Sequence, residues 1–286
     1  MAYTTLISAA ELATHSNDSR FVIVDCRHDL LNPDVGPAAY SAGHIAGARF
    51  AHLDKLLSGT KIGIDGQFKG RHPLPQRQDF IAAMQSLGIN NDTQVIAYDA
   101  VDGRYAARLW WLLRWVGHAQ IAVLDGGLQA WQTHGGAIDT SIPEVATGNL
   151  EAHPPLVESV DAAIVLNNIS EKKMTLVDAR SADRYRGENE TIDPVGGHIP
   201  GAKNRFFLDN LESDGRFKPA AALRSEWNTL LEHPQQAIMQ CGSGVTACHN
   251  LLALEIAGLS GAKLYPGSWS EWCAEPSRPV ATGPLP

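Results

Sequence analysis

FVIVDCRHD at residues 21–29 recurs in similar form as MTLVDARSAD at residues 174–183. Each copy is an apolar run, rich in β-branched residues, that ends in Asp-x-Arg. Such a run is typical of a short strand buried in a parallel sheet. Because the two copies lie far apart in the chain, they indicate an internal duplication.

Three further segments recur in the same order in the two halves. The matching pairs are AYSAGHIAGARF (39–50) with PVGGHIPGAKNRF (194–206), TQVIAYDAVDGRYAARLWWLLRWVG (93–117) with QAIMQCGSGVTACHNLLALEIAG (236–258), and AVLDGGLQAW (122–131) with AKLYPGSWSEW (262–272). Short β-branched runs alternate with helical stretches in both copies, which predicts an α/β fold. We therefore expect two tandem domains, each with a central, mainly parallel sheet flanked by helices.

The stretch between the two copies is rich in proline and poor in aliphatic pairs, which is typical of a linker. We accordingly expect a first domain over residues 1–140, a linker over 141–158 and a second domain over 159–286. A chain of 286 residues is long enough for two domains of ordinary size.

Composition restricts the partners and the compartment. The formal net charge of -8 argues against nucleic acid or an anionic membrane, both of which favour a basic face, so a small molecule is expected as ligand. No apolar run approaches the ~18 residues of a membrane helix, and the first residues lack the pattern of a targeting peptide. The 4 cysteines form no C-x-x-C pair, which favours a reducing, cytoplasmic compartment. The 11 histidines show no metal-ligand spacing, and no cofactor is expected.

Ligands of open α/β sheets bind beyond the carboxyl ends of the strands. That rule selects Cys241 in the second half and Asp99 at the matching place in the first. Cys241 precedes Gly242, Ser243 and Gly244, and a helix is expected to begin near Thr246.

Glycines let a loop turn its N–H groups toward one atom, and a helix N-terminus adds positive potential. Settings of this kind lower the pKa of a cysteine from ~8.5 to ~3.5–7.5. The pattern therefore predicts a nucleophilic thiolate at Cys241, with Ser243 as a further donor and the Thr246 hydroxyl as a helix cap. The other cysteines, Cys26, Cys248 and Cys273, lack this setting and are expected to be packed in the core, with an oxidative pairing of Cys248 and Cys241 as the alternative.

The doubled domain, GHIPGA, the loop CGSGVTA and the closing YPGSWSEW resemble the two-domain rhodanese-like sulfurtransferases, and the loop is most similar to that of the 3-mercaptopyruvate sulfurtransferases. The resemblance implies that the second domain is catalytic and that the first, with Asp99 in place of cysteine, is not. It also implies that Cys241 takes sulfur from a donor as a persulfide, releasing pyruvate, and that a thiol or cyanide then removes it. Thioredoxin is the acceptor that the family suggests.

The resemblance extends to the residues around the cysteine. It implies that Gly242, Gly244, Val245 and Thr246 contact the donor and that Arg184 in DRYRG binds the donor carboxylate, with Arg186 as the nearby substitute. Family members of the mercaptopyruvate type carry a second arginine before Gly-His-Ile, and ENETIDPVG at residues 188–196 has none.

Further roles follow from the same likeness. Ser243, Asp54 and His72 match the residues that assist the departing enolate, the last two from the first domain across a cleft. His44 and His198 recur in both halves, including the one without the cysteine, and are expected to be structural.

The sequence leaves three alternatives to weigh. Thiosulfate-preferring relatives carry basic residues after the cysteine, where this chain has Gly242 and Ser243, so the loop offers no cation and mercaptopyruvate is favoured as donor. A cysteine phosphatase needs an arginine at the position of Ala247. A non-enzymatic thiol sensor or docking module would also keep Cys241, and only turnover separates it from an enzyme.

Overall fold

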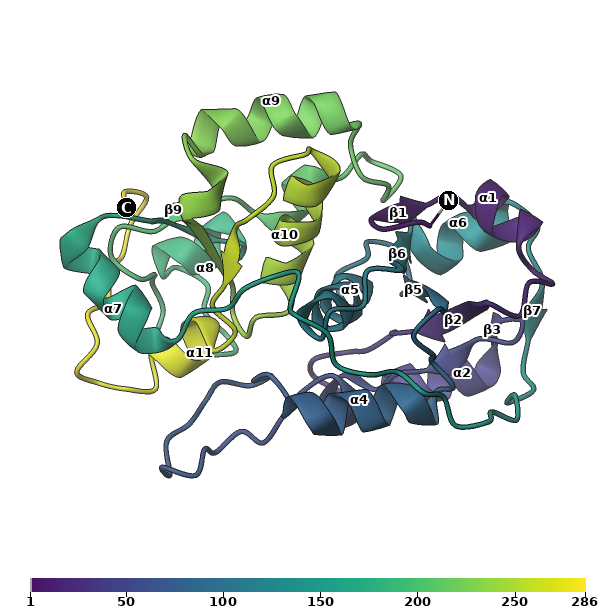
Figure 1. The fold of residues 1–286 in the computed structure, drawn as a ribbon. Helices are drawn as coiled ribbons and strands as arrows, with labels where there is room; N and C mark the ends of the chain where they lie inside the picture. Colours follow the sequence, from purple (N-terminus) through teal and green to yellow (C-terminus); the bar gives the residue numbers. More distant parts are fainter. Residues whose placement is uncertain (1) are drawn as a thin grey trace. The chain divides into compact units, whose positions relative to one another are not determined.

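The computed structural model describes residues 2–286, which form two compact units (Figure 1). Unit 1 contains residues 2–59 together with Pro75–Leu156 and Leu211–Phe217. Unit 2 contains Thr60–Leu74, Val157–Asn210 and Lys218–Pro286. Each unit has its own sheet, and the predicted α/β class is confirmed.

The sheet of unit 1 has five parallel strands in the order β1 (Leu6–Ile7), β6 (Ile121–Leu124), β5 (Gln94–Tyr98), β2 (Phe21–Asp25) and β4 (Arg49–Phe50). Every residue of β5 is buried, because this central strand is covered on both faces. The helices of unit 1 are α1 (Ala9–Thr14), α2 (Val35–Ala42), α3 (Leu53–Leu56), α4 (Arg77–Ser86), α5 (Ala106–Trp115) and α6 (Gly127–Thr133). A separate antiparallel pair joins β3 (His44–Ile45) and β7 (Ile138–Asp139).

Unit 2 repeats this arrangement with four parallel strands in the order β11 (Lys263–Leu264), β10 (Ala237–Gln240), β8 (Thr175–Asp178) and β9 (Lys203–Asn204). A parallel bridge from Ser159 to Leu264 continues the sheet where unit 1 has β1. The helices are α7 (Ala162–Glu171), α8 (Ala182–Arg186), α9 (Ala220–Leu230), α10 (Thr246–Ile256) and α11 (Ser268–Trp272), with 3₁₀ turns at Phe207–Asn210 and Pro234–Gln236.

The repeated Asp-x-Arg motif makes the same bonds in both units. The Asp25 carboxylate accepts from Nε and Nη2 of Arg27, whose Nη2 also donates to a glycine carbonyl at 2.7 Å. Asp178 and Arg180 do the same in unit 2, again with a glycine carbonyl at 2.7 Å. Each motif thus fixes the chain after a central strand to the Gly-His-Ile segment of its own unit.

The two Gly-His-Ile histidines are structural, as expected. The ring of His44 stacks on Tyr40 at 3.9 Å between centroids, and Nδ1 lies 2.8 Å from the Tyr40 carbonyl oxygen. The ring of His198 stacks on Tyr185 at 3.8 Å, with Nδ1 2.9 Å from its carbonyl oxygen. Both histidines are fully buried, and each closes a tight packing contact inside its unit.

A hairpin motif outside the four repeated segments is also present twice. Asp-Gly-x-Phe-Lys stands at residues 65–69 and again at 214–218. Antiparallel bridges join Ile62 to Phe68 in the first and Leu211 to Phe217 in the second. The first hairpin belongs to unit 2 although it comes from the first half of the chain.

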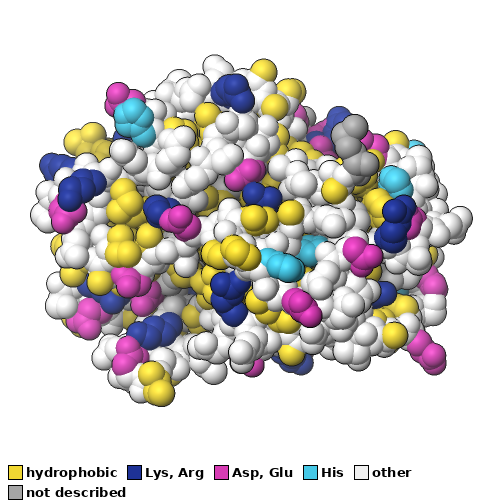
Figure 2. All heavy atoms as spheres, in the orientation of Figure 1, with side chains coloured by type: hydrophobic (Ala, Val, Ile, Leu, Met, Phe, Trp, Pro, Cys, Tyr) yellow, Lys and Arg dark blue, Asp and Glu magenta, His cyan; other side chains and the backbone are white. Residues whose placement is uncertain are grey.

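Over residues 2–286, no helix combines the length and the apolar character needed to cross a bilayer. On the face drawn in Figure 2, Lys and Arg side chains are interspersed with Asp and Glu and do not gather into one basic patch.

Candidate functional site

Cys241 lies in the turn between β10 and α10, directly after the strand's last residue. Its side chain is buried, with a relative exposure of 2% for the residue, and the N–H of Gly244 donates to Sγ at 3.1 Å. The Cys241 N–H donates to Ser268 Oγ at 3.1 Å, and its carbonyl accepts from the Trp269 N–H at 2.9 Å. The predicted strand, glycine turn and helix are therefore all present, with the sulfur beside a backbone donor.

Gly244 is required by the shape of this turn. Its φ is +75°, a backbone conformation that side chains disfavour. A Cβ at this position would also collide with the backbone of Pro266. The glycine thus allows the chain to turn back so that its N–H reaches the sulfur.

The expected hydroxyl cap of Thr246 is wrong. The N-cap of α10 is Val245, which makes no side-chain cap bond, and Thr246 is the first helical residue. Val245 already has helical backbone angles, whereas a capping side chain needs an extended residue at the N-cap.

The other cysteines are packed, as predicted. Cys26 and Cys248 are fully buried and Cys273 is 8% exposed. Burial raises the pKa of the Cys26 thiol well above its usual range and that of Cys273 to about 11. The Cys248 thiol donates to the Gly244 carbonyl at 3.3 Å, and all four cysteines are thiols.

Ser243 and His72 meet in unit 2. His72 Nδ1 lies 2.8 Å from Ser243 Oγ, and both residues are buried. His72 comes from the segment Thr60–Leu74, which belongs to unit 2, so the expectation that it reaches Ser243 from the first domain across a cleft is wrong. Asp54 lies in unit 1 as the second residue of α3, with its carboxylate 3.8 Å from His28 Nε2, and its role stays a prediction.

Two guanidinium groups lie beside Gly242. A Cβ built on Gly242 would be 2.8 Å from Arg71 Nη2 and 3.6 Å and 3.7 Å from Nη2 and Nη1 of Arg184. The expectation that the loop is without a cation is therefore incomplete. The loop's own side chains are uncharged, but tertiary structure places two arginines against it.

Two buried carboxylates hold these arginines. Arg184 donates from Nε and Nη2 to Glu190 at 2.8–3.1 Å, and its Nη2 lies 3.3 Å from Asp193. Arg71 Nη1 pairs with the other oxygen of Asp193. Burial acts to raise the pKa of Glu190, but the bonds from Arg184 and from backbone amides outweigh it and lower that pKa. Burial raises the pKa of Asp193, against the effect of Arg71.

The sequence reasoning missed Arg71. The sequence signal for Arg71 is the repeated hairpin motif. Arg71 lies two residues after the first copy of this motif and immediately before His72. Arg186, named as a substitute for Arg184, is bonded instead to Glu188 at 2.6–2.8 Å, with 32% of its side chain exposed. Its guanidinium therefore forms an ion pair at the surface.

Unit 1 carries a different group at the matching place. Asp99 directly follows β5 and accepts N–H groups of Gly103, Tyr105 and Ala106 at 2.8–3.3 Å. The carboxylate thus occupies its own loop of amides, beside a cavity of about 430 Å³. Burial, with the nearby Asp102 carboxylate, raises the pKa of Asp99 to about 6, although the amide bonds oppose this.

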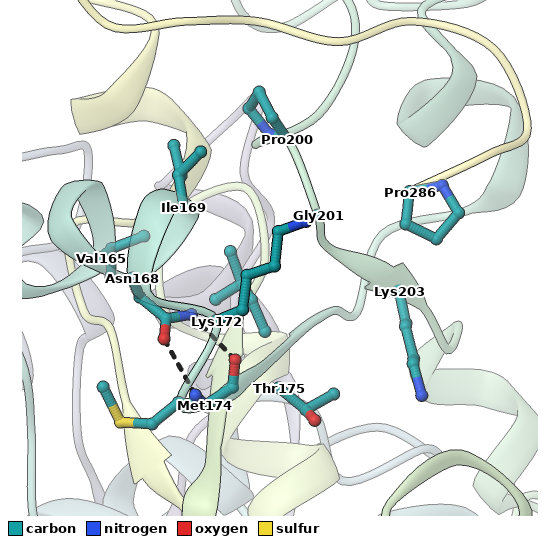
Figure 3. A pocket seen from close by; sticks show the side chains of 11 residues that line it. Val165, Asn168, Ile169, Lys172, Met174, Thr175, Pro200, Gly201, Lys203 and Pro286 are labelled. Atoms are coloured by element: carbon teal, nitrogen blue, oxygen red, sulfur yellow. Dashed lines mark hydrogen bonds between the residues drawn. The ribbon is translucent and has the colours of Figure 1, made fainter.

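A further cavity of about 530 Å³ lies in unit 2 at the amino-terminal end of β8, between α7 and the chain before β9 (Figure 3). Lys172 and Lys203 line it, and the Asn168 amide bridges both backbone groups of Met174 at its edge. The Cys241 turn follows the carboxyl end of β10, which is parallel to β8. The cavity and the cysteine therefore lie at opposite ends of the sheet.

Comparison with known proteins agrees with this geometry. A family model described as "Rhodanese-like domain" matches residues 8–134 and 161–275. The chain is 42% identical over 287 residues to a "Probable 3-mercaptopyruvate sulfurtransferase" of Pseudomonas aeruginosa, covering 99% of this chain and 100% of the relative. It is 40% identical to a Mycobacterium tuberculosis protein, SseB, whose name places it among the thiosulfate sulfurtransferases, with 97% of each chain covered.

Among solved structures, the crystal structure of SseA from Escherichia coli, described as a 3-mercaptopyruvate sulfotransferase, superimposes with a TM-score of 0.81. The sequences are 32% identical, and the match covers 94% of this chain and 100% of that one. The expected two-domain fold is confirmed by this match.

Proposed function

Because the chain belongs to the rhodanese-like family, we propose that it is a sulfurtransferase that moves sulfur from 3-mercaptopyruvate through Cys241 to a thiol or cyanide. The observation that carries the proposal is the Cys241 sulfur at a strand-to-helix turn, with a backbone N–H at 3.1 Å and two guanidinium groups beside the next residue. A reactive sulfur and a place for a carboxylate thus lie next to each other.

In the first half-reaction, the Cys241 thiolate attacks the sulfur of the donor. A bond forms between the two sulfur atoms while the carbon–sulfur bond of the donor breaks, and its electron pair leaves on the pyruvate enolate. Cys241 then carries one additional sulfur atom as a persulfide. The Gly244 N–H stabilises negative charge on Sγ before the attack and after the persulfide has been discharged.

The enolate needs a proton at carbon to become pyruvate. The Ser243 hydroxyl lies beside Cys241 in the turn, and His72 lies 2.8 Å from it, so the two can hold and move a proton at Ser243 Oγ. Both are buried, which excludes bulk water from the exchange. We assign Ser243 as the proton donor to the enolate and His72 as the group that restores its proton, with Asp54 as a further contributor.

In the second half-reaction, an acceptor thiolate or cyanide attacks the outer sulfur of the persulfide. The sulfur–sulfur bond breaks and Cys241 leaves as thiolate, ready for another donor. A dithiol of the thioredoxin kind fits as acceptor, because its second thiol can release the sulfur as sulfide. Four cysteine thiols agree with a reducing, cytoplasmic setting for this chemistry.

Thiosulfate is the second candidate donor. The arginines beside Gly242 supply the positive charge that the loop itself lacks, and a sulfonate could use it. The M. tuberculosis relative named for that donor points the same way. We favour mercaptopyruvate, because Glu190 and Asp193 neutralise much of the charge that a dianion would need.

The test compares kcat/KM for 3-mercaptopyruvate and for thiosulfate with one acceptor, and follows Cys241 by mass spectrometry. We expect repeated release of pyruvate, a higher kcat/KM for the oxo acid, and one additional sulfur on Cys241 when no acceptor is present. Cys241→Ser should abolish turnover, whereas Cys273→Ser should retain it, because that thiol has its pKa raised to about 11.

A clear preference for thiosulfate would replace the donor that we propose. Modification of Cys241 without repeated turnover would instead favour a thiol sensor. A sulfur atom found on another cysteine would contradict the assignment of Cys241 itself.

A further inference from the structure

A hydrogen bond from its backbone and an ion pair of its side chain hold Arg71 beside the cysteine turn. Its N–H donates to Ser270 Oγ at 3.1 Å, and Ser270 in turn donates its own N–H to the Gly242 carbonyl at 2.9 Å. Its Nη2 is the atom nearest to a Cβ built on Gly242, at 2.8 Å. A side chain at position 242 would therefore displace this guanidinium.

Asp193 couples Arg71 to Arg184. One carboxylate oxygen pairs with Arg71 Nη1 and the other lies 3.3 Å from Arg184 Nη2. The Asp193 side chain is only 3% exposed, while those of Arg71 and Arg184 are 21% and 19% exposed. The carboxylate is thus buried behind the two arginines, which remain accessible.

Each arginine keeps an unused donor group on the side of Gly242. Within residues 2–286, Arg71 Nη2 and Arg184 Nη1 make no hydrogen bond to a protein acceptor. Both atoms lie within 3.7 Å of the position that a Cβ of Gly242 would take. Paired N–H donors on two partly exposed guanidinium groups are the arrangement that binds a carboxylate.

The second copy of the domain acquires this arrangement through a longer loop. Tyr40 lies 4 residues before His44, whereas Tyr185 lies 13 residues before His198, although the two rings stack in the same way. The additional residues include Asp193. The unit with the cysteine is therefore the one with a loop that holds an arginine from elsewhere in the chain.

We propose that Arg71 and Arg184 together bind the donor's carboxylate, and that Asp193 is the positioning residue that sets their separation and limits the positive charge of the site. The inference rests on the proposed function, since it names the residues that recognise the donor of that reaction. Arg71 contributes to specificity because it helps to bind the single carboxylate of a 2-oxo acid. The negative charge of Asp193 disfavours a dianionic donor.

The first experiment measures KM and kcat for 3-mercaptopyruvate in Arg71→Gln. We expect KM to rise about 10- to 100-fold, the effect of losing one charge-assisted hydrogen bond, while discharge of preformed Cys241 persulfide by the acceptor keeps its rate. Arg20→Gln is the matched control, because its guanidinium pairs with Asp18 at the surface with 73% of the side chain exposed, and its KM should equal that of the unmodified protein. Inhibition by added pyruvate should weaken in parallel in Arg71→Gln.

A second variant separates binding from folding. Arg71→Gln leaves the buried Asp193 carboxylate with one partner fewer, which can destabilise the protein. The double variant Arg71→Gln/Asp193→Asn also removes the negative charge of Asp193. Its KM for 3-mercaptopyruvate should stay high even if its thermal stability returns to that of the unmodified protein. Asp193→Asn alone should raise the ratio of kcat/KM for thiosulfate to that for 3-mercaptopyruvate. If the unmodified protein turns over 3-mercaptopyruvate and Arg71→Gln has the same KM, the role of Arg71 is overturned and the proposed function stands. If the unmodified protein shows no turnover, the proposed function is overturned.

Discussion

Ser243 and His72 form a buried pair of side chains to which the proposed function assigns proton transfer. Neither residue is unusual in sequence, but their atoms lie 2.8 Å apart in unit 2, next to the cysteine turn. The two donor candidates differ in what such a pair can offer them. Pyruvate leaves as an enolate that needs a proton at carbon, whereas sulfite leaves thiosulfate as a stable anion.

We expect Ser243→Ala to lower kcat for 3-mercaptopyruvate by about 10²-fold, the lower end of the range for general acid catalysis, and to affect thiosulfate turnover much less. Steady-state kinetics with both donors measures this difference. Ser170→Ala, at an exposed position of α7 in the same unit, should change neither rate. An equal loss with both donors would assign Ser243 to positioning the turn.

The turn between β10 and α10 is the element on which the site depends. The strand delivers Cys241 to the carboxyl end of the sheet, and Gly244 reverses the chain so that its N–H faces the sulfur. Asp99 occupies the corresponding turn after β5 and fills its own ring of amides. The corresponding turns thus hold a cysteine sulfur in unit 2 and a carboxylate in unit 1.

Gly244→Ala should destabilise unit 2 more than Gly201→Ala does. Both glycines have positive φ, +75° and +83°, so each substitution costs about 1–2 kcal/mol in backbone strain. Only Gly244 adds a collision with the Pro266 backbone, because a Cβ on Gly201 would meet nothing within 4 Å. Denaturant unfolding measures the difference, and mass spectrometry should find the Cys241 persulfide in Gly201→Ala but not in Gly244→Ala. Equal unfolding free energies would show that the turn tolerates the side chain.

At the scale of the whole molecule, each unit has its own sheet and its own hydrophobic core. His118 belongs to unit 1, is buried, and its Nε2 lies 2.9 Å from the Thr93 carbonyl oxygen. Burial lowers the pKa of His118 below its usual value, although the backbone bonds oppose this. The unfolded chain therefore binds the proton more readily than the folded one, and stability is lost as pH falls through about 6.5.

The midpoint temperature for thermal unfolding of unit 1 should consequently decrease as the pH is lowered from about 7.5 to about 5.5. His118→Asn should reduce this dependence on pH, whereas His134→Asn, at an exposed position of the same unit, should leave it unchanged. Differential scanning calorimetry across that range checks the prediction. If the unfolding temperature changes equally with pH in the unmodified protein, in His118→Asn and in His134→Asn, a titratable group other than His118 controls the pH dependence.

Most of the fold could be predicted from the repeated motifs. The strands at residues 21–25 and 175–178 and the helix beginning at Thr246 follow from runs of local sequence, because apolar periodicity and glycine turns act between near neighbours. The cap at Thr246 was wrong for a local reason as well, since the backbone angles of Val245 are not encoded in a motif.

Family membership and the position of the cysteine turn can thus be predicted from the order of the residues, because a duplicated motif and a strand, glycine turn and helix are local patterns. The charge around Cys241 is not, since Arg71 and Asp193 stand 122 positions apart and meet only in the folded unit. Local sequence suggests a turn without cations, and folding places two guanidinium groups against it. The physical reason is that an ion pair depends on distance in space, which a chain of this length leaves open until its hairpins and loops have packed.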